Sequence, residues 1–396
     1  MPNIIIVIPT YWTWSSQQTD GPVETFYDHP TPTDSESTLP RLLHSLAAWE
    51  GPAFSVLILT ATAHSDMDQA AASTVERLIS PFRAHYPIAQ ATETDAALIR
   101  QRHPRLAAHV QMRGYAGVRN LQLLLSRTLR AEIVIALDDD EVVEPDYLRV
   151  ATEWVGREHY GEPVLGLAGF YLDLDGEVVV SEGLHTGNIY LDKPAIMNEG
   201  TRALQSAPSR LVPTPVAFGG NMIFHRNLFT QVGFDPGITR GEDIDYLINA
   251  RLAGFSFWLD KKLVITHLPP HQYNLSPYIK LAEDVRRFIY EQEKLRLALK
   301  HNAFPLTPAD LMPYPGRFLN DDAMNQARAA LETIATPELE QAYGTPSQII
   351  TQAQAHARQI APNYFDFAQS WPRLMDAVAG DDVLCDRLAA RLLLDT

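Results

Sequence analysis

An apolar run that ends in three consecutive aspartates is the feature that most limits how this chain can fold. Residues 133–137 read Ile-Val-Ile-Ala-Leu, which is typical of a strand buried on both faces. Asp138, Asp139 and Asp140 follow at once. Adjacent carboxylates repel one another unless a cation or protonation relieves the charge, and Mg²⁺ and Mn²⁺ prefer such oxygen ligands. Because open α/β sheets bind ligands beyond the carboxyl ends of their strands, the run predicts a metal site there.

Two other interpretations of these acids have to be weighed. A calcium-binding EF-hand loop would need an oxygen ligand at its fifth position and glycine at its sixth. Counted from Asp138, those positions hold Val142 and Val143, which excludes that loop. Acids also favour the N-terminus of a helix, and Glu144-Pro145-Asp146 indicates a helix that begins just after. That plainer explanation remains open.

Strand-like and helical segments alternate through the first part of the chain. Apolar runs predict strands, and apolar residues at helical spacing predict helices. The strands are expected at 4–8, where Pro9-Thr10 ends the run, at 54–59 and at 133–137, and the helices at 39–49, 73–82 and 118–130. This alternation predicts an α/β fold with a parallel sheet flanked by helices. Residues 14–40, rich in Pro, Thr, Ser and Asp, predict a long inserted loop.

The pattern changes in the second half of the chain. Strands are expected at 165–174 and 177–181, as a hairpin around Asp175-Gly176, and then at 216–224, 255–259 and 263–267. A helix is expected over 244–253, ended by Gly254, and further helices over 279–299, 323–334, 346–359 and 371–394. We therefore predict a catalytic α/β domain over residues 1–275 and a helical C-terminal extension over 276–396.

Composition narrows the class of protein. The net charge of -16 and the pI of about 5.2 argue against nucleic acid as a partner and against binding to anionic lipid through a polybasic surface. One cysteine, Cys385, excludes an internal disulfide and a cysteine-rich zinc site. The N-terminus lacks a basic region, and no stretch reaches the ~20 apolar residues of a membrane span. We expect no integral membrane segment and a cytoplasmic place of work.

Other candidate functional residues are individually weak signals. Glu242, Asp243 and Asp245 open a predicted helix, where acids usually complement the dipole; near a metal, such a carboxylate becomes a candidate general base. His267 ends a predicted strand and suits Mn²⁺ as a ligand, or is simply a hydrogen-bonded histidine. Gly219 and Gly220 permit the close approach of a ligand or of another segment, and Arg119 is able to meet a phosphate or to form a surface salt bridge.

The order of these features is more specific than any one of them. The chain carries Ile-Val-Ile-Pro-Thr-Tyr at 6–11, Gly-Val-Arg-Asn at 117–120, Leu-Asp-Asp-Asp-Glu at 137–141 and Glu-Pro-Asp at 144–146. Phe-Gly-Gly-Asn-Met-Ile-Phe-His-Arg at 218–226, Gly-Glu-Asp-Ile-Asp at 241–245 and His267 continue the series. Over residues 3–271 this order resembles the inverting family 2 glycosyltransferases of the GT-A fold, whose sheet is Rossmann-like and mainly parallel.

The resemblance implies a nucleotide-sugar donor (a UDP- or GDP-sugar), a carbohydrate or other hydroxyl acceptor, and Mn²⁺ or Mg²⁺. It assigns a donor pocket to Pro9, Thr10, Tyr11, Arg119, Asp138, Asp139, Gly219 and Gly220, with Asp138 near the ribose and no separate role for Asp139. It assigns the metal bridging the diphosphate to Asp140, with Asp138 and His267 beside it. Asp243 matches the catalytic base, and Glu242 lies next to it.

The chain departs from the family pattern in two places. Thr60 to His64 replace the acidic turn that is common after the second strand, so the nucleobase stays open. The insertion at 14–40, with Tyr11, Trp12 and Trp14 near its start, forms part of an acceptor site or lid, or is an ordered surface loop. Residues after about 276 lie outside the resemblance. They pack on the catalytic domain, recognise the acceptor or support a homo-oligomer, and the sequence does not decide among these.

Three other functions stay open. A sugar nucleotidyltransferase shares such a sheet and acidic site, but would be expected to carry a Gly-rich basic loop after the first strand, where this chain has an acidic Pro/Thr-rich one. A degenerate protein of this fold would only bind a sugar or nucleotide, although Asp138, Asp140, Asp243 and His267 are all present. A retaining glycosyltransferase would keep the same metal aspartates.

Overall fold

The computed structural model describes residues 3–18, 23–49, 51–183, 185–269, 276–301 and 303–392. Its centre is a ten-stranded sheet in the order β10-β12-β9-β11-β5-β1-β3-β4, with β2 on β1 and β6 on β12. The strands are β1 Ile4–Thr13, β2 Thr31–Pro32, β3 Ser55–Thr62, β4 Ile88–Ala91, β5 Ile133–Ala136, β6 Glu141–Val142, β9 Gly166–Leu172, β10 Leu211–Pro213, β11 Met222–His225 and β12 Trp258–His267. A separate ribbon pairs β7 (Glu158–His159) with β8 (Glu162–Pro163).

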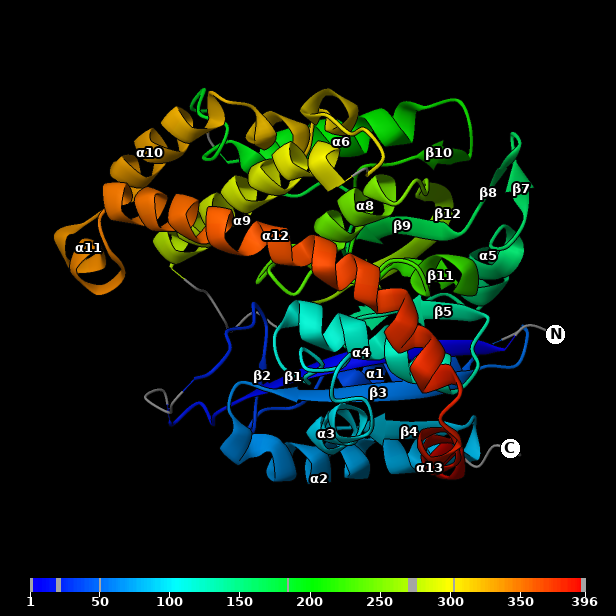
Figure 1. Ribbon diagram of the computed structural model, residues 1–396. Coiled ribbons are helices and arrows are strands. Elements are labelled where there is room, and N and C mark those ends of the chain that lie inside the picture. Colours follow the sequence, from blue (N-terminus) through cyan, green and yellow to red (C-terminus); the bar gives the residue numbers. More distant parts are fainter. Residues whose placement is uncertain are drawn as a thin grey trace.

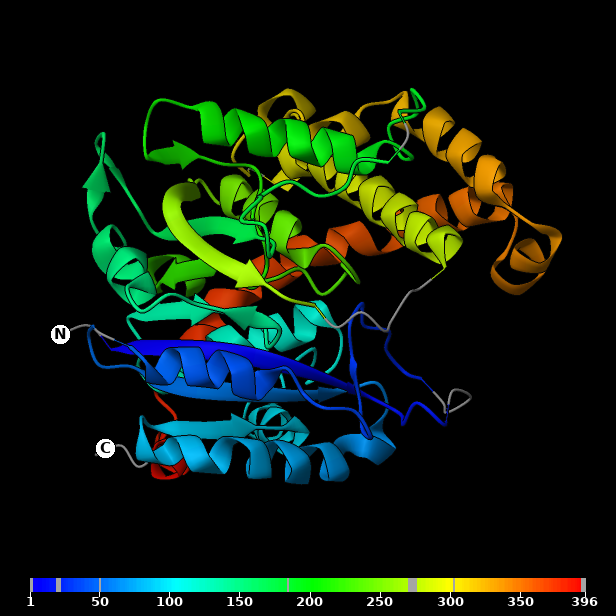
Figure 2. The same ribbon diagram turned by 180° about the vertical axis from the view of Figure 1, so that it is seen from behind.

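Helices cover both faces of this sheet. In Figure 1, α4 and α12 lie in front of the strands, and the reverse view in Figure 2 brings α1 to the front. The helices are α1 Leu39–Ala47, α2 Asp68–Ile79, α3 Glu93–Arg102, α4 Tyr115–Thr128, α5 Tyr147–Glu153, α6 Lys193–Ser206, α7 Arg226–Phe229, α8 Glu242–Leu252, α9 Pro277–Ala298, α10 Ala323–Ile334, α11 Pro337–Tyr343, α12 Pro346–Ala379 and α13 Asp382–Leu392. The predicted α/β class, with helices flanking the sheet and a helical C-terminal region, is confirmed.

The sheet is mixed rather than uniformly parallel. β5, β1, β3 and β4 run parallel, as expected, and β9 runs parallel to β12. β11 lies antiparallel between β5 and β9, and β10 and β6 lie antiparallel to β12. Alternate residues of β1 enter two apolar layers: Ile5 and Val7 face one, and Ile4 and Ile6 face the other. Because both faces are buried, residues 4–8 of this strand are all apolar.

Several predicted boundaries were wrong for local physical reasons. β1 continues through Pro9 to Thr13. Its pairing with β5 ends at Val7, so this side of β1 is a free edge at Pro9, where a residue without an N–H group is tolerated. The expected strands at 255–259 and 263–267 are one strand, β12, with a shift of register between Leu259 and Val264. The strand expected from 216 begins only at Met222.

The expected hairpin forms its turn but not its second strand. Asp173 Oδ1 accepts the backbone N–H groups of Asp175 and Glu177, each at 2.9 Å, and so holds the turn around Asp175-Gly176. Residues 177–181 are not a strand. Instead the side chain of Asn198 in α6 accepts the N–H of Val180 at 3.0 Å and donates to its carbonyl at 2.7 Å. An amide side chain thus replaces the missing strand partner.

The C-terminal helices pack onto the rest of the molecule. The two helices expected at 346–359 and 371–394 are α12, which runs unbroken through Pro362 and Pro372, and α13, which begins after Gly380. α12 packs along α9 and against α4, and α13 contacts β4 (Figure 1). Residues 270–275, where the predicted division between catalytic domain and extension falls, lie outside the described part of the chain, and that division stays a prediction.

A buried ion network joins α8 to α9. Lys294 of α9 is fully buried and donates to Asp235 at 2.9 Å, to Asn249 at 2.9 Å and to Asp245. Tyr290 donates to the same Asp235 carboxylate at 2.7 Å. Asp245, predicted only as an acid of a helical start, is therefore a structural ion-pair partner that ties α8 to the C-terminal helices.

We expect Lys294→Met to destabilise the fold by about 3–5 kcal/mol, because it leaves buried carboxylates without their cation. The free energy of unfolding in urea measures this. Lys300→Met is the matched control: Lys300 is exposed just after α9, so its loss should cost at most about 0.5 kcal/mol. Equal stabilities for the two variants would contradict the structural role of the network.

Candidate active site

One edge of the sheet gathers the predicted site residues. Val7 of β1 lies opposite Ala136 of β5, and β1 continues beyond the end of β5, so Tyr11 of β1 and the acids that follow Leu137 lie at the same edge of the sheet. β11 runs antiparallel and starts at Met222 opposite Ala136, which brings the preceding glycines there. His267 ends β12 opposite Glu141. The strand register therefore explains why segments far apart in sequence meet at this edge.

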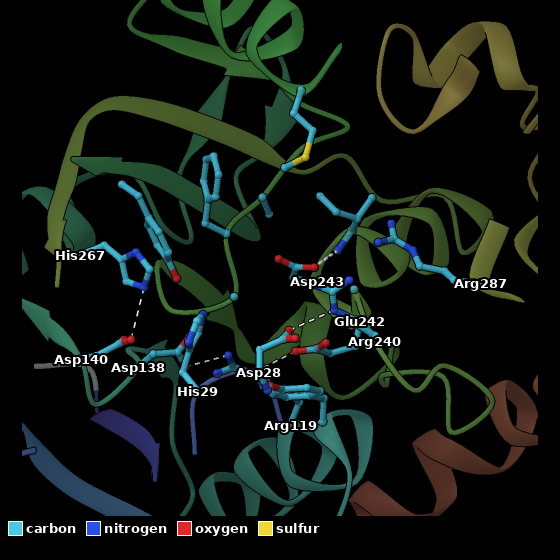
Figure 3. Close-up of a pocket in the computed structure, with 18 of the residues that line it drawn as sticks. Asp28, His29, Arg119, Asp138, Asp140, Arg240, Glu242, Asp243, His267 and Arg287 are labelled. Atoms are coloured by element: carbon cyan, nitrogen blue, oxygen red, sulfur yellow. Dashed lines mark hydrogen bonds and ion pairs between the residues drawn. The ribbon is translucent and has the colours of Figure 1, made fainter. Parts of the chain in front are cut away.

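These segments surround a cavity of about 300 Å³ (Figure 3). Nine of the predicted residues line it: Tyr11, Arg119, Asp138, Asp139, Asp140, Gly219, Glu242, Asp243 and His267. The other three do not: Pro9 and Thr10 are buried within β1, and Gly220 is buried behind the cavity wall. The acids of the triple aspartate and those of α8 thus share one cavity.

Arg119 and His267 each meet an acid of the triple aspartate. Arg119, which is 3% exposed on α4, donates to Asp138 at 2.7 Å and lies 3.5 Å from the Glu242 carboxylate. Nε2 of His267 lies 3.4 Å from Oδ2 of Asp140. The ring of Tyr171 lies 4.8 Å from that of His267, between centroids, and fixes its orientation. Arg119 therefore links the two acidic groups across the cavity.

Glu141 holds the loop of acids in place. Its carboxylate is fully buried and accepts the backbone N–H of Asp138 at 3.0 Å. Burial and the neighbouring charges of Asp138 and Asp140 raise its pKa well above the usual value. A Cβ at Gly220 would lie 1.9 Å from Oε1 of Glu141, so glycine is the residue that leaves room for this buried carboxyl.

Gly220→Ala should therefore destabilise the protein by about 1–3 kcal/mol, since the added methyl collides with a carboxyl that cannot move away. Gly200→Ala in α6 is the control. A Cβ added there makes only ordinary van der Waals contacts, the nearest at 3.5 Å. Thermal melting compares the two variants. A Gly220→Ala protein as stable as the Gly200→Ala protein would show that the Glu141 carboxyl is not confined as described.

The start of α8 presents two neighbouring carboxyls to the cavity. Gly241 precedes the helix with a φ of 74°, a left-handed conformation that glycine adopts without strain. Glu242 is 7% exposed, and burial together with the adjacent Asp243 charge raises its pKa to about 7, although Arg119 opposes this. Asp243 is more exposed, and its Oδ1 accepts the N–H of Ile244 at 2.8 Å. Of the two, Asp243 is the carboxyl more open to the cavity.

The inserted segment reaches the cavity. Tyr27 packs against Tyr11 and Tyr115, with ring centroids 4.5 and 5.3 Å away. Its hydroxyl accepts the N–H of Gly114 at 3.2 Å. Asp28 and His29, which follow, line the cavity. Residues 19–22 of the insertion lie outside the described chain; the part that follows contributes to the site.

Sequence reasoning missed a group of residues at the end of the cavity nearest Asp243. They come from α6, the segment before α8, α9 and the chain that follows it: Lys193, Met197, Arg240, Asp284, Arg287 and Tyr314. In Figure 3, Arg287 lies next to Asp243, and the Asp140–His267 pair lies on the opposite side. No periodicity or motif marks these positions, because their pairing depends on contacts between distant segments.

The residues present suit a divalent cation that is shared with a ligand. Among the described residues, no three His, Cys, Asp or Glu side chains converge closely enough to hold a metal on their own. However, Oδ2 of Asp139 is buried with no hydrogen-bond partner within the described chain, and Asp140 and His267 face each other at 3.4 Å. Mg²⁺ and Mn²⁺ often take only one or two protein ligands and complete their shell with phosphates and water. The donor set therefore fits such an ion.

No helix within the described residues is both long and apolar enough to cross a membrane.

No protein-family model matches this chain, and no curated protein does. Among solved structures it is similar to the mannosyltransferase PcManGT from Pyrobaculum calidifontis in complex with GDP-Man and Mn²⁺, with 14% identity and a TM-score of 0.46 over 96% of this chain and 87% of that one.

Two further structures are similar to it. S. aureus TarS 1–349 in complex with UDP has 12% identity and a TM-score of 0.39 over 94% of this chain and 91% of that one. GalNAc-T7 with UDP, GalNAc and Mn²⁺ has 11% identity and a TM-score of 0.40; the match covers 87% of this chain but 56% of that one. With similarities this distant, the activity of the chain has to be argued from its own residues.

Proposed function

We propose that this protein is a metal-dependent glycosyltransferase of the GT-A type, which moves a sugar from a nucleoside-diphosphate sugar to an acceptor hydroxyl. The observation that carries the proposal is the meeting, in one cavity, of the Asp138–Asp140 acids and His267 with the carboxyls that open α8. One group suits a cation and a diphosphate, and the other suits proton removal. The order of motifs, which resembles the family 2 glycosyltransferases, supports the same function.

Asp140 and His267, with Asp138 beside them, would hold Mn²⁺ or Mg²⁺. When bound, the ion would offset the negative charge that grows on the departing diphosphate. Asp138 accepts a hydrogen bond from Arg119 at 2.7 Å, and its carboxyl oxygens are suited to accept hydrogen bonds from a donor ribose. Burial raises the pKa of this carboxyl, and the Arg119 charge opposes the rise. Gly219 leaves room beside Arg119: a Cβ there would lie 2.8 Å from Nη2.

Asp243 takes the base role. It accepts the proton of the acceptor hydroxyl as that oxygen bonds to the anomeric carbon, and the bond from this carbon to the diphosphate oxygen breaks with its electron pair on the leaving group. The start of α8 stabilises the negative charge of Asp243 before the transfer. The metal residues and Asp243 lie on opposite sides of the cavity (Figure 3), an arrangement that favours attack from the face opposite the leaving group, and therefore inversion.

A thermal-shift panel tests the donor class. The purified protein is melted with UDP, GDP, ADP and inorganic phosphate, each with Mn²⁺ and each with EDTA. We expect one nucleoside diphosphate to raise the melting temperature only with Mn²⁺, because a ligand that binds the folded state alone stabilises it. The absence of a metal-dependent shift with any nucleotide would contradict the proposal and favour the degenerate form of the fold.

Inversion is tested separately, by NMR of the product. A donor with an α-linked sugar should give a β-linked product, and the coupling constant of the anomeric proton reports which is formed. An α-linked product would contradict the single displacement and assign the chain to the retaining enzymes of this fold.

A further inference from the structure

Helix α9 of the C-terminal region places an arginine with a free donor in the cavity wall. Arg287 is 7% exposed, and its Nε donates to Glu291 at 2.8 Å. Nη1 donates to the Tyr314 hydroxyl at 3.4 Å. Nη2 has no hydrogen-bond partner within the described chain, although it is buried. A buried guanidinium donor without a partner is costly, so an oxygen atom of a ligand is the natural group to complete it.

The position of Arg287 relates this donor to the reaction. The guanidinium lies against the backbone of Gly241: a Cβ on that glycine would be 1.9 Å from Nη1. Gly241 directly precedes the carboxyls of α8, and Arg287 and Asp243 line the same cavity. Figure 3 shows the two side chains as neighbours, away from Asp140 and His267. A group bound by Arg287 is therefore on the side of the base, where the acceptor has to sit.

The remaining charges at this end form a chain of ion pairs. Arg240 donates to Asp28 of the insertion at 3.0 Å and lies 3.5 Å from Asp284 of α9. Lys193 of α6 donates to the other oxygen of Asp284, with 2.5 Å between the atoms. These contacts join four segments that are distant in sequence. They make α9 and the inserted segment part of the cavity wall, so neither is only a surface addition.

Charge decides which ligand this end accepts. The three cations Lys193, Arg240 and Arg287 are matched by the three acids Asp28, Asp284 and Glu291. Asp243 adds one negative charge. Arg119, the other arginine of the cavity lining, is paired with Asp138, so the described lining residues leave no unpaired Lys or Arg to offset a phosphate or carboxylate of the acceptor. Such an anion would instead meet the Asp243 charge at low dielectric. A hydroxyl oxygen accepts a hydrogen bond from Arg287 without bringing charge into the cavity.

Resting on the glycosyltransferase function above, we propose that α6, α9 and Tyr314 form the acceptor subsite, and that it binds an uncharged sugar through hydrogen bonds from Arg287 to the ring hydroxyls. Met197 of α6 and the Tyr314 ring supply the apolar contacts that a sugar face takes. The C-terminal extension is thereby assigned to acceptor recognition.

The test uses the full chain with the nucleotide sugar that it turns over. Release of nucleoside diphosphate is measured with neutral methyl glycosides of glucose, mannose and galactose as single acceptors, and with glucuronate and glucose 6-phosphate as their anionic counterparts. We expect a neutral glycoside to stimulate release more than either anion. Arg287→Gln should then raise the acceptor KM about tenfold or more, which corresponds to the loss of one hydrogen bond from a charged donor, while calorimetry gives an unchanged affinity for the nucleoside diphosphate.

A second variant tests the subsite independently, in case the loss of the Arg287–Glu291 ion pair unfolds the protein. Met197→Trp narrows the subsite from α6 and should also raise the acceptor KM. Ala203→Trp places the same side chain on an exposed position of the same helix and should leave all constants unchanged. Melting temperatures of each variant identify any that fails to fold.

Three results would overturn the subsite: stronger stimulation by glucuronate or glucose 6-phosphate, no stimulation by any neutral sugar although the donor is consumed in water, or an acceptor KM that neither Arg287→Gln nor Met197→Trp changes. A protein that consumes no nucleotide sugar at all would contradict the glycosyltransferase function itself, so the two failures are distinguishable.

Discussion

Replacing Asp243 with asparagine should lower the rate of sugar transfer by about 10²–10⁴-fold, the usual contribution of a positioned general base. Asparagine has nearly the same shape, and its side-chain oxygen is able to keep the hydrogen bond from Ile244 N–H, which is 2.8 Å long in the structure. The amide does not accept the proton of the acceptor hydroxyl. The kcat for nucleoside-diphosphate release in the presence of an acceptor measures the effect, and the affinity for the nucleoside diphosphate with Mn²⁺ should stay within about twofold.

Glu242→Gln is the informative comparison, since Glu242 is the adjacent carboxyl and points toward Arg119, 3.5 Å away, rather than freely into the cavity. We expect its effect on kcat to be smaller than that of Asp243→Asn. If Glu242→Gln abolishes transfer and Asp243→Asn does not, the base role passes to Glu242.

Replacing Asp140 with alanine should weaken Mn²⁺-dependent binding of the nucleoside diphosphate by about 100-fold or more. Removing a residue that only supports a metal ligand already costs about 10–100-fold in metal affinity, and the loss of the ligand itself should cost at least as much. Asp140 is 7% exposed and lies 3.4 Å from His267, so its removal takes away one of the two facing ligands of the proposed site. Titration calorimetry with the nucleoside diphosphate, in Mn²⁺ and in EDTA, measures the change.

Asp321→Ala is the control for Asp140→Ala, because Asp321 is exposed and does not line the cavity. His267→Ala should weaken the same binding to a lesser degree, since an imidazole contributes a neutral ligand. An unchanged Mn²⁺-dependent affinity in Asp140→Ala would remove this residue from the metal site.

The parts of the fold that sequence predicts are those that depend on local patterns. The strand at 133–136, and with it the position of the acids beyond its end, was predictable because a strand buried on both faces must be continuously apolar. α10 begins and ends where its helical spacing indicates, at Ala323 and Ile334. β4, by contrast, is four residues long and reads Ile-Ala-Gln-Ala, too short to show a period.

Tertiary packing overrode local signals elsewhere. The expected helices at 346–359 and 371–394 leave a break around Pro362, yet α12 continues through Pro362 and Pro372. Proline removes one backbone hydrogen bond and costs about 3 kcal/mol within a helix. The long face that α12 buries against α9 and α4 offsets that cost. Such compensation depends on partners that are distant in the sequence and leaves no local trace.

The candidate site divides in the same way. Asp138, Asp140, Arg119, Asp243 and His267 belong to ordered motifs and do meet in one cavity. The proposed acceptor subsite was not predictable, because the ion pairs around it join residues that are far apart: Asp28 with Arg240, and Lys193 with Asp284. Each of these side chains is an ordinary surface charge when seen only in the sequence.

Phosphorus NMR of the reaction tests the central claim most directly. The protein is incubated with Mn²⁺, methyl glycosides and a UDP- or GDP-sugar, and the phosphorus products are followed over time. Parallel samples contain EDTA in place of Mn²⁺, or added pyrophosphate. The account predicts that nucleoside diphosphate accumulates only when Mn²⁺ is present. Nucleoside triphosphate formed from added pyrophosphate would identify a nucleotidyltransferase, and an unchanged donor would contradict sugar transfer by this chain.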